Sequence, residues 1–312
     1  MAIISDASVA PTIVRGRSKR ARRHHRATSA WLFLLPSAVV LGAVLLYPLG
    51  YAIYLSLFNY DLGAGIYKFI GAGNYTALLG EQRFWASLLR TVLIVTSAVT
   101  LEFCLGLAVA YGLYRLTFGV RTLNLLMFMP SVITPVVAAL FLRWIFIGRW
   151  GLLSGILISL GFFPPDFLGD PGWARVTVVL ADAWQFTPFL ILVLYAGLNT
   201  VDQSQIEAAG IDGAGTWKLL FRIMMPNIRA LIVFVLAIRL MDSFRFFDQI
   251  YVLTAGGPGT ATETITMYTY ALAFRLLQIG KASALGVLTL LFTAGMIALM
   301  IAAVYRRERG AF

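Results

Sequence analysis

Long runs of apolar residues, separated by polar segments, are the main pattern along the chain. An α-helix needs about 20 residues to cross the hydrocarbon core of a bilayer, and each run is long enough. The segments between them carry the glycines, prolines and charges. We therefore predict an all-α membrane protein, a polytopic bundle of six transmembrane helices, spanning residues 31–58, 87–114, 121–146, 175–200, 228–252 and 283–305.

The positions of the basic residues predict which side of the membrane each loop faces. Seven of them precede the first run: Arg15, Arg17, Lys19, Arg20, Arg22, Arg23 and Arg26. Such clusters stay in the cytoplasm. With the N-terminus inside, the C-terminus and loops 115–121 and 201–227 are also cytoplasmic, and their lysines and arginines agree with this. The outer segments are then 59–86, 147–174 and 253–282.

Composition excludes several classes of protein. The 312-residue chain is 60% hydrophobic and 12% charged, which is typical of an integral membrane protein. Its net charge of +11 could suggest nucleic acid, but the concentration of charge beside the first span indicates an anchor, and we expect no nucleic-acid partner. Cys104 is the only cysteine, so no internal disulfide or thiolate metal site is expected. We expect it to be a small buried hydrophobe.

The polar segment 201–226 lies between the fourth and fifth runs. Ser204 and Glu207 have the spacing of a capping box, which predicts a helix from Gln205. Gly213 and Gly215 would allow a turn after that helix.

A second helix is predicted from Thr216 to Pro226, which would stop it. It would carry one apolar stripe, formed by Trp217, Leu220, Phe221 and Met224. Two interpretations remain open on these grounds. The segment either docks on another protein or is a re-entrant loop packed on its own bundle.

The same segment resembles the EAA coupling loop of permease subunits from binding-protein-dependent ABC importers. The matching residues are Glu207-Ala208-Ala209, Asp212-Gly213-Ala214 and Ile223-Met224-Met225-Pro226, where Met225 replaces the usual leucine. The resemblance implies a cytoplasmic coupling-helix loop that rests on a separate ATPase. Its site residues would be Glu207, Ala208, Ala209, Gly210, Asp212, Gly213, Ala214, Arg222 and Pro226.

A second stretch, with Gly256-Gly257-Pro258 and the threonines that follow, resembles the maltose and glycerol-phosphate branch of carbohydrate permeases. It implies import of a carbohydrate, a di- or oligosaccharide, through the bacterial inner membrane. The implied partners are a second permease of different sequence, two ATP-binding cassette subunits and an extracytoplasmic solute-binding (lipo)protein.

The chain is not expected to be an enzyme. It contains no G-x-x-x-x-G-K-[ST] string, so ATP and Mg²⁺ are expected on the partner ATPase, with no cofactor, metal or catalytic residue in this chain. The domain organisation expected is a basic tail at 1–30, which can contact membrane lipid, a transmembrane domain at 31–305 and a cytoplasmic tail at 306–312.

Polar residues inside predicted spans are costly and mark candidate functional sites. One helical face of the fourth span carries Asp182, Gln185 and Phe189, and the fifth offers Arg239, Asp242, Ser243 and Phe246. Such groups can bind a sugar by hydrogen bonds and ring stacking. The resemblance places a sugar site here, with Phe186 added. The alternative is that Asp182, Arg239 and Asp242 form buried ion pairs or a subunit contact.

Two alternative functions remain. A proton-coupled secondary transporter would use Glu102, Asp182 and Asp242, although a single acid such as Glu102 more often pairs with a polar group on a neighbouring helix. An intramembrane enzyme, such as a lipid-linked sugar transferase, lacks support because both histidines, His24 and His25, lie in the basic tail.

Overall fold

The computed structural model describes residues 19–309, and side chains over 35–302. Residues 1–18 of the predicted basic tail and 310–312 of the C-terminal tail lie outside the described part. The chain forms two compact units, Met1–Tyr51 and Ala52–Phe312, which are described separately. Helix α1 (Lys19–Ser56) contains Pro36 and Pro48, and its stretch Leu35–Ser56 is apolar enough to span a membrane.

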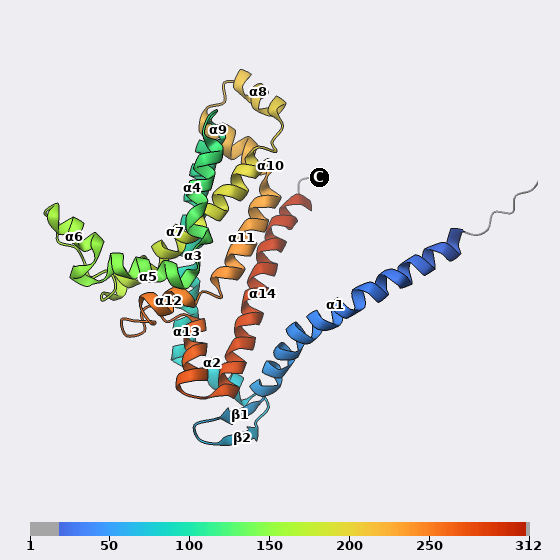
Figure 1. Cartoon of the computed structure of the whole chain (residues 1–312), viewed down its shortest axis with the longest axis vertical. Helices are drawn as coiled ribbons and strands as arrows, with labels where there is room; N and C mark the ends of the chain where they lie inside the picture. Colours follow the sequence, from blue (N-terminus) through green and yellow to red (C-terminus); the bar gives the residue numbers. More distant parts are fainter. Residues whose placement is uncertain (1–18, 310–312) are drawn as a thin grey trace, which may run out of the picture. The chain divides into compact units, whose positions relative to one another are not determined.

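Helices dominate the second unit, as predicted (Figure 1). The described residues of both units together contain four helices that are long and apolar enough to cross a membrane. The number of candidate spans rises to six if each of two bent helix pairs is one span. The long ones in this unit are α3 (Gln82–Tyr114), α7 (Pro171–Leu198) and α14 (Ile279–Arg309). The Asp170 carboxylate caps α7 by accepting hydrogen bonds from the amides of Gly172 and Trp173.

The third apolar run is not one straight helix. It is divided into α4 (Val120–Val132) and α5 (Pro135–Phe146), whose axes differ by 93°. Ile133 and Thr134 between them have extended backbones, as expected before a proline, whose ring disfavours a helical conformation in the preceding residue. The span predicted at 121–146 therefore consists of two helices separated by a sharp bend.

The fifth run is also interrupted. Helix α11 (Arg229–Ser243) ends in an irregular stretch, after which α12 (Asp248–Leu253) begins. A bend of 77° separates α11 from the short helices before it. Each break leaves backbone groups outside regular helix, which is tolerated at membrane depth where protein surrounds the break or where it lines a cavity.

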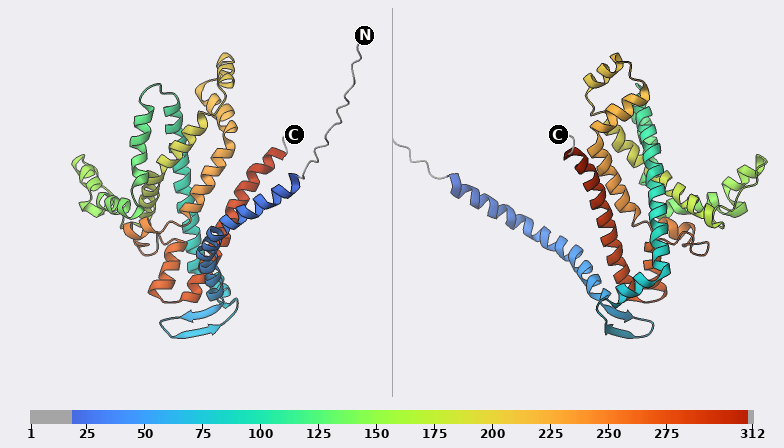
Figure 2. Two further views of the ribbon diagram at one scale, coloured as in Figure 1. Left: turned by 45° about the vertical axis from the view of Figure 1, so that its right-hand side comes forward. Right: turned by 180° about the vertical axis from the view of Figure 1, so that it is seen from behind.

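The end opposite α8 contains an element that the sequence did not predict (Figure 2). Strands β1 (Phe58–Asp61) and β2 (Ile66–Phe69) form an antiparallel hairpin, with Phe58 paired to Phe69. The Leu62 amide donates to the Leu277 carbonyl at 3.0 Å, joining the hairpin to the start of α14. Shorter elements complete the fold: α2 (Gly73–Gly80), a 3₁₀ turn (Gly148–Trp150), α6 (Leu152–Ser159), α13 (Ile265–Tyr270) and a π-helical turn (Ala271–Arg275).

The centre of the second unit is the packing of α3 along α7. Gly106 allows this approach, because a Cβ there would lie 2.9 Å from the Cβ of Leu190. Leu107, Leu194 and Leu198 belong to the same buried cluster. Cys104, in contrast, is exposed, so the expectation that it is buried is wrong; it lies on a face of α3 away from this packing.

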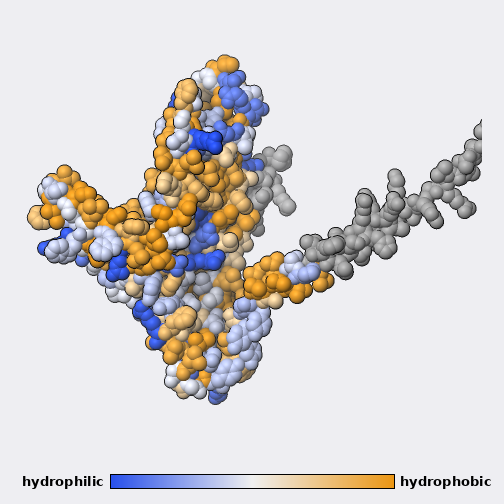
Figure 3. Space-filling model, in the orientation of Figure 1, coloured by the Kyte–Doolittle hydropathy of each residue, from blue (hydrophilic) through white to orange (hydrophobic). Residues whose placement is uncertain are grey.

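Apolar surface is widespread on the second unit, as expected of a membrane protein. Orange, hydrophobic residues cover much of the α5–α6 arm, whereas blue residues gather near α8 (Figure 3). Trp144 of α5 is 75% exposed, and on α6 Ser154 is buried while Leu152 is exposed. Placing apolar side chains outward and a hydroxyl inward is the reverse of the pattern on a water-facing helix.

Candidate coupling segment and intramembrane polar site

The segment at 201–226 forms a helical pair at one end of the second unit, as predicted in outline. Helix α8 covers Gln203–Ile211. Its N-cap is Asp202, whose carboxylate accepts from the Ser204 amide at 3.0 Å. The predicted capping box from Ser204 to Glu207, with a helix from Gln205, is therefore wrong by two residues. An Asp side chain at the start of a helix is an equally good acceptor for these free amides.

The hydrogen bond from the Ser204 amide lowers the pKa of the Asp202 carboxyl, since it favours the ionised form.

The turn after α8 depends on Gly213, which has φ of +70°. Gly215 has an ordinary negative φ, so only the first of the two predicted glycines needs its conformational freedom. The following helix comprises α9 (Thr216–Leu219), a π-helical turn (Leu220–Met224) and α10 (Met225–Asn227). Pro226 lies within α10, so the helix ends one residue after the predicted stop.

The predicted apolar stripe is divided between two environments. Leu220 and Met224 are 2% and 0% exposed and belong to the core formed with α3 and α7. Trp217 and Phe221 are 72% and 50% exposed, with stacked rings 5.8 Å apart. One face therefore holds the segment to its own bundle, and the other is free for a partner.

The residues of the coupling resemblance are mostly exposed. Gln205 accepts from the Asn227 side chain at 2.9 Å, which fixes α8 to α10. Ala209 is buried and Ala214 is half-buried, while the other predicted residues are exposed: Glu207, Ala208, Gly210, Asp212, Gly213, Arg222 and Pro226. The apolar side chain of Ile211, 88% exposed, belongs to the same surface and was missed because it has no place in the predicted stripe.

A buried ion cluster joins three helices in the middle of the second unit. Arg239 of α11 donates two hydrogen bonds of 2.7 Å to the Glu102 carboxylate of α3 and one of 3.1 Å to Asp182 of α7. All three side chains are at most 2% exposed. The guanidinium also lies 4.2 Å from the ring centre of Phe186. Such a bidentate pair is strong and fixes the geometry of both partners.

Gln185 fastens the interrupted spans to α7. Its side-chain amide donates to the carbonyl of Ile133, in the break between α4 and α5, at 2.7 Å. Its own backbone carbonyl accepts from Ser131 at 2.7 Å. Its side-chain oxygen accepts from Gln249 of α12. The Gln185 side chain therefore satisfies the Ile133 carbonyl, which the break between α4 and α5 leaves without a partner in a helix.

A small polar cavity of about 110 Å³ lies beside the ion cluster. We name it the polar cavity; its lining includes Pro135, Asp182, Phe186, Arg239, Asp242, Ser243, Arg245, Phe246, Phe247, Asp248 and Gln249. Three of the lining residues have a buried side-chain oxygen without a hydrogen-bond partner among the described residues: Asp182 Oδ1, Ser243 Oγ and Gln249 Oε1. They make the cavity able to bind a ligand that donates hydrogen bonds.

Six of the eight residues proposed for the substrate path line the polar cavity: Asp182, Phe186, Arg239, Asp242, Ser243 and Phe246. Gln185 contacts the lining residue Gln249, and Phe189 packs instead against the core with Leu190. The sequence did not single out Pro135, Phe247 or Gln249 for this site. Only the bend at Pro135 and the interruption before α12 bring them to it.

The alternative of buried ion pairs also holds for Asp182 and Arg239, with Glu102 in place of Asp242 as the third member. Glu102 pairs with a polar group on a neighbouring helix, as expected for a single intramembrane acid. No group of three or more His, Cys, Asp or Glu that could hold a metal ion occurs within residues 19–309.

A bundle with interrupted spans around a polar cavity, and a short helical pair at one end, is the architecture of a membrane transport subunit. A family profile described as the binding-protein-dependent transport system inner membrane component matches residues 102–309. The chain belongs to this family of inner membrane proteins.

Relatives extend the similarity over most of the chain. A probable ABC transporter permease of Sinorhizobium fredii is 33% identical, covering 97% of this chain and 98% of the relative. The sulfoquinovosyl glycerol permease of Agrobacterium fabrum is 34% identical, with 89% of each covered. The trehalose permease of Mycobacterium tuberculosis is 36% identical, with 83% of each covered.

Solved structures share the fold. A chain of a bacterial alginate ABC transporter, solved with an alginate-bound periplasmic protein, has a TM-score of 0.77 at 19% identity, covering 91% of this chain and 96% of that one. A second structure of a bacterial alginate importer gives 0.79 at 20% identity, covering 93% and 99%. The fold predicted from the hydrophobic pattern is thereby confirmed.

Proposed function

We propose that this chain is a permease subunit of an ATP-driven ABC importer that moves a carbohydrate into the cytoplasm. The observation that carries the proposal is the division of the segment at 201–226 between a buried face and an exposed face. Leu220 and Met224 anchor it in the bundle, while Glu207, Ile211 and Trp217 are exposed. A partner that moves this segment also moves the helices on which it is fixed.

The partner that fits is a pair of ATP-binding cassette subunits, which would hold ATP and Mg²⁺. The assembly would further contain a second permease and an extracytoplasmic solute-binding protein. Family membership supports dependence on a binding protein. Both chain ends and the coupling segment would face the cytoplasm.

The carbohydrate is supported by two observations. The relatives include permeases described for trehalose and for sulfoquinovosyl glycerol. The polar cavity combines aromatic rings with buried hydrogen-bond acceptors, which suits hydroxyl groups. Its volume of about 110 Å³ is below the roughly 300 Å³ of small ligand pockets, so this conformation must open to admit a sugar.

The proton-coupled alternative is less well supported by the geometry. Glu102, its main carrier, is engaged by Arg239 through both carboxylate oxygens. Import into proteoliposomes containing the complete complex should therefore require ATP and survive a protonophore. Import that collapses with the proton gradient, and proceeds without ATP, contradicts the proposal.

The coupling role is tested by co-purification and ATPase assays. Glu207→Ala combined with Gly213→Asp should abolish ATP-dependent uptake, and Trp217→Ala should weaken retention of the ATPase without lowering the unfolding temperature of the permease.

Met224→Ala, on the buried face, should instead lower the unfolding temperature of the permease, because emptying a core site costs about 2–5 kcal/mol. Gln203→Ala, exposed on α8 but outside the resemblance, is the control. Unchanged uptake in the double variant would refute the coupling role.

A further inference from the structure

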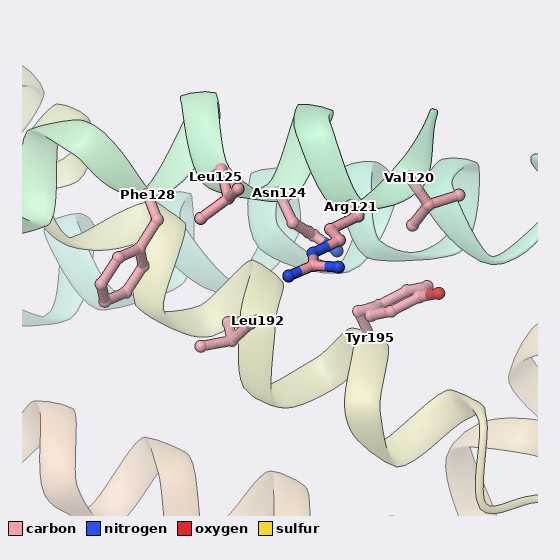
Figure 4. A pocket seen from close by; sticks show the side chains of 7 residues that line it. All are labelled: Val120, Arg121, Asn124, Leu125, Phe128, Leu192 and Tyr195. Carbon is pink, nitrogen blue, oxygen red and sulfur yellow. The ribbon is translucent and has the colours of Figure 1, made fainter. Parts of the chain in front are cut away.

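A second concave site lies at the end of the bundle nearest the coupling segment. We name it the α4–α7 groove. It has a volume of about 600 Å³ and is far larger than the polar cavity. Figure 4 shows it in close view, between the first turns of α4 and the last turns of α7, lined by Val120, Arg121, Asn124, Leu125, Phe128, Leu192 and Tyr195.

The polarity of the groove changes along its length. Arg121 lies in the first turn of α4, and its side chain reaches toward α7 beside Tyr195 (Figure 4). Phe128 lies two turns further along α4, about 10 Å away at 1.5 Å per residue. On α7 the apolar Leu192 is likewise further from the end of the helix than Tyr195. One end of the groove is therefore cationic and polar, and the other is apolar.

The polar side chains of the groove are not used to hold the bundle together. Within the described residues, the side chains of Arg121, Asn124 and Tyr195 have no hydrogen bond or ion pair. Two other arginines at the surface of the second unit are engaged: Arg115 donates to Thr216, and Arg143 donates to the Val252 carbonyl at 2.6 Å. The groove contains no acidic residue. It thus presents a positive charge with two further hydrogen-bonding groups.

We propose that the α4–α7 groove binds an anionic phospholipid of the inner leaflet. The phosphate would accept hydrogen bonds from Arg121, Asn124 and Tyr195, and an acyl chain would follow Leu125, Phe128 and Leu192. This inference rests on the orientation in the proposed function, which places the start of α4 at the cytoplasmic surface. There the order of groups, cation first and apolar side chains deeper, matches the order of a phospholipid from headgroup to chain.

Charge decides between this ligand and others. A sugar has no apolar part to fill the inner half of the groove. A zwitterionic lipid also carries a phosphate, but the cation of its own headgroup offsets that charge, so its net attraction to Arg121 is weaker than that of an anionic lipid. Basic pockets between membrane helices on the cytoplasmic side are sites for anionic headgroups. The contribution of one arginine near the surface corresponds to about a fivefold preference for the anionic lipid.

Native mass spectrometry of the purified, delipidated transporter tests the preference. Cardiolipin or phosphatidylglycerol is titrated against phosphatidylcholine, with the wild type, Arg121→Gln and Arg115→Gln. Arg115 is the matched control because it lies at the same end of the bundle without lining the groove. We expect Arg121→Gln to lose about fivefold in anionic lipid binding and Arg115→Gln to retain it. Equal binding by all three proteins overturns the proposal.

Photo-crosslinking identifies what occupies the groove without removing the arginine. Leu125 is replaced by p-benzoylphenylalanine in the complete transporter and irradiated in native membranes. An adduct with the mass of an anionic phospholipid supports the proposal. An adduct with a permease or ATPase chain, or with lipids in proportion to their abundance, overturns it. Neither result bears on uptake of carbohydrate, so failure here is distinct from failure of the importer proposal.

Discussion

At the scale of single residues, Arg239 is the centre of the buried ion cluster. It meets Glu102, Asp182 and the Phe186 ring at once. Removing one partner of a buried pair leaves an uncompensated charge, which is far more costly than the net contribution of the intact pair. The cluster therefore fixes α3, α7 and α11 relative to one another.

Arg239→Met is expected to destabilise the protein by about 3–5 kcal/mol, because Glu102 and Asp182 would then lie close together without a cation. Thermal unfolding of the purified transporter, followed by intrinsic fluorescence, measures this. Arg245→Met is the control, since Arg245 is exposed and only six residues away. An unfolding temperature for Arg239→Met as high as that of the control would show that the cluster is dispensable for stability.

Glu81 is the residue that should make the stability of the protein respond to acid, at the end of the second unit that carries the β1–β2 hairpin. Partial burial raises the pKa of its carboxyl, but the hydrogen bonds from Lys281 and Tyr268 lower it by more, and the result lies below the ordinary value of 4.5. Its ionised form therefore stabilises the folded state above about pH 4.5, and this stabilisation is lost as pH falls through the lower folded-state pKa.

Glu81→Gln is accordingly expected to flatten the dependence of the unfolding temperature on pH below 4.5. The variant should be less stable than the wild type at neutral pH, and the difference should shrink as the medium becomes acidic. If the unfolding temperature falls equally steeply in both proteins between pH 5 and 3, Glu81 does not contribute to the stability of the folded state. The buried phenol of Tyr268, whose pKa is raised by burial and by Glu81, remains neutral throughout this range.

At the scale of elements, the contact of α3 with α7 depends on the absence of a side chain at Gly106. The nearest atom is the Leu190 Cβ, at the fixed base of its side chain, so the neighbour cannot give way by changing rotamer. Close helix packing through small residues is common in membrane proteins, where lipid provides no hydrophobic force between helices.

Gly106→Ala should destabilise the protein by about 1–3 kcal/mol, as overpacking usually does. Gly112→Ala is the matched substitution in the same helix, at a position with open space around it, and should be neutral or slightly stabilising because alanine favours helix. Unfolding temperatures of both variants compare the two effects. A Gly106→Ala protein as stable as Gly112→Ala would mean that α3 and α7 shift apart without cost.

At the scale of the whole molecule, the proposed orientation separates the β1–β2 hairpin from the coupling segment by the membrane. The views of the second unit place them at opposite ends (Figures 1 and 2). Ala64 in the hairpin loop and Ile211 at the end of α8 are both exposed, which makes them suitable positions for a topological label.

In a Cys104→Ser background, Ala64→Cys should react with an impermeant thiol reagent in cells with a permeable outer membrane. Ile211→Cys should react only after the inner membrane is opened. The background substitution is necessary because Cys104 is itself exposed. Labelling of Ile211→Cys in the closed cells would reverse the orientation, and with it the leaflet proposed for the lipid.

The sequence by itself determined the membrane class and the positions of the apolar runs. Long unbroken hydrophobic stretches have few alternatives, because every backbone group must be satisfied within the segment. It also placed the segment at 201–226 and drew attention to Asp182 and Arg239, since charges inside spans are rare. The turn at Gly213 followed from the conformational freedom of glycine.

Only the tertiary structure decided which polar groups meet. Glu102 and Arg239 are 137 residues apart, and no local pattern predicts that they pair. The division of the Trp217 stripe and the contacts of Gln185 both arise from packing between helices. Hydrophobic periodicity reports that a residue avoids water, but it does not distinguish lipid from protein as the apolar surroundings. That distinction, which exposes Cys104 on a helix inside the membrane region, requires the arrangement of the whole bundle.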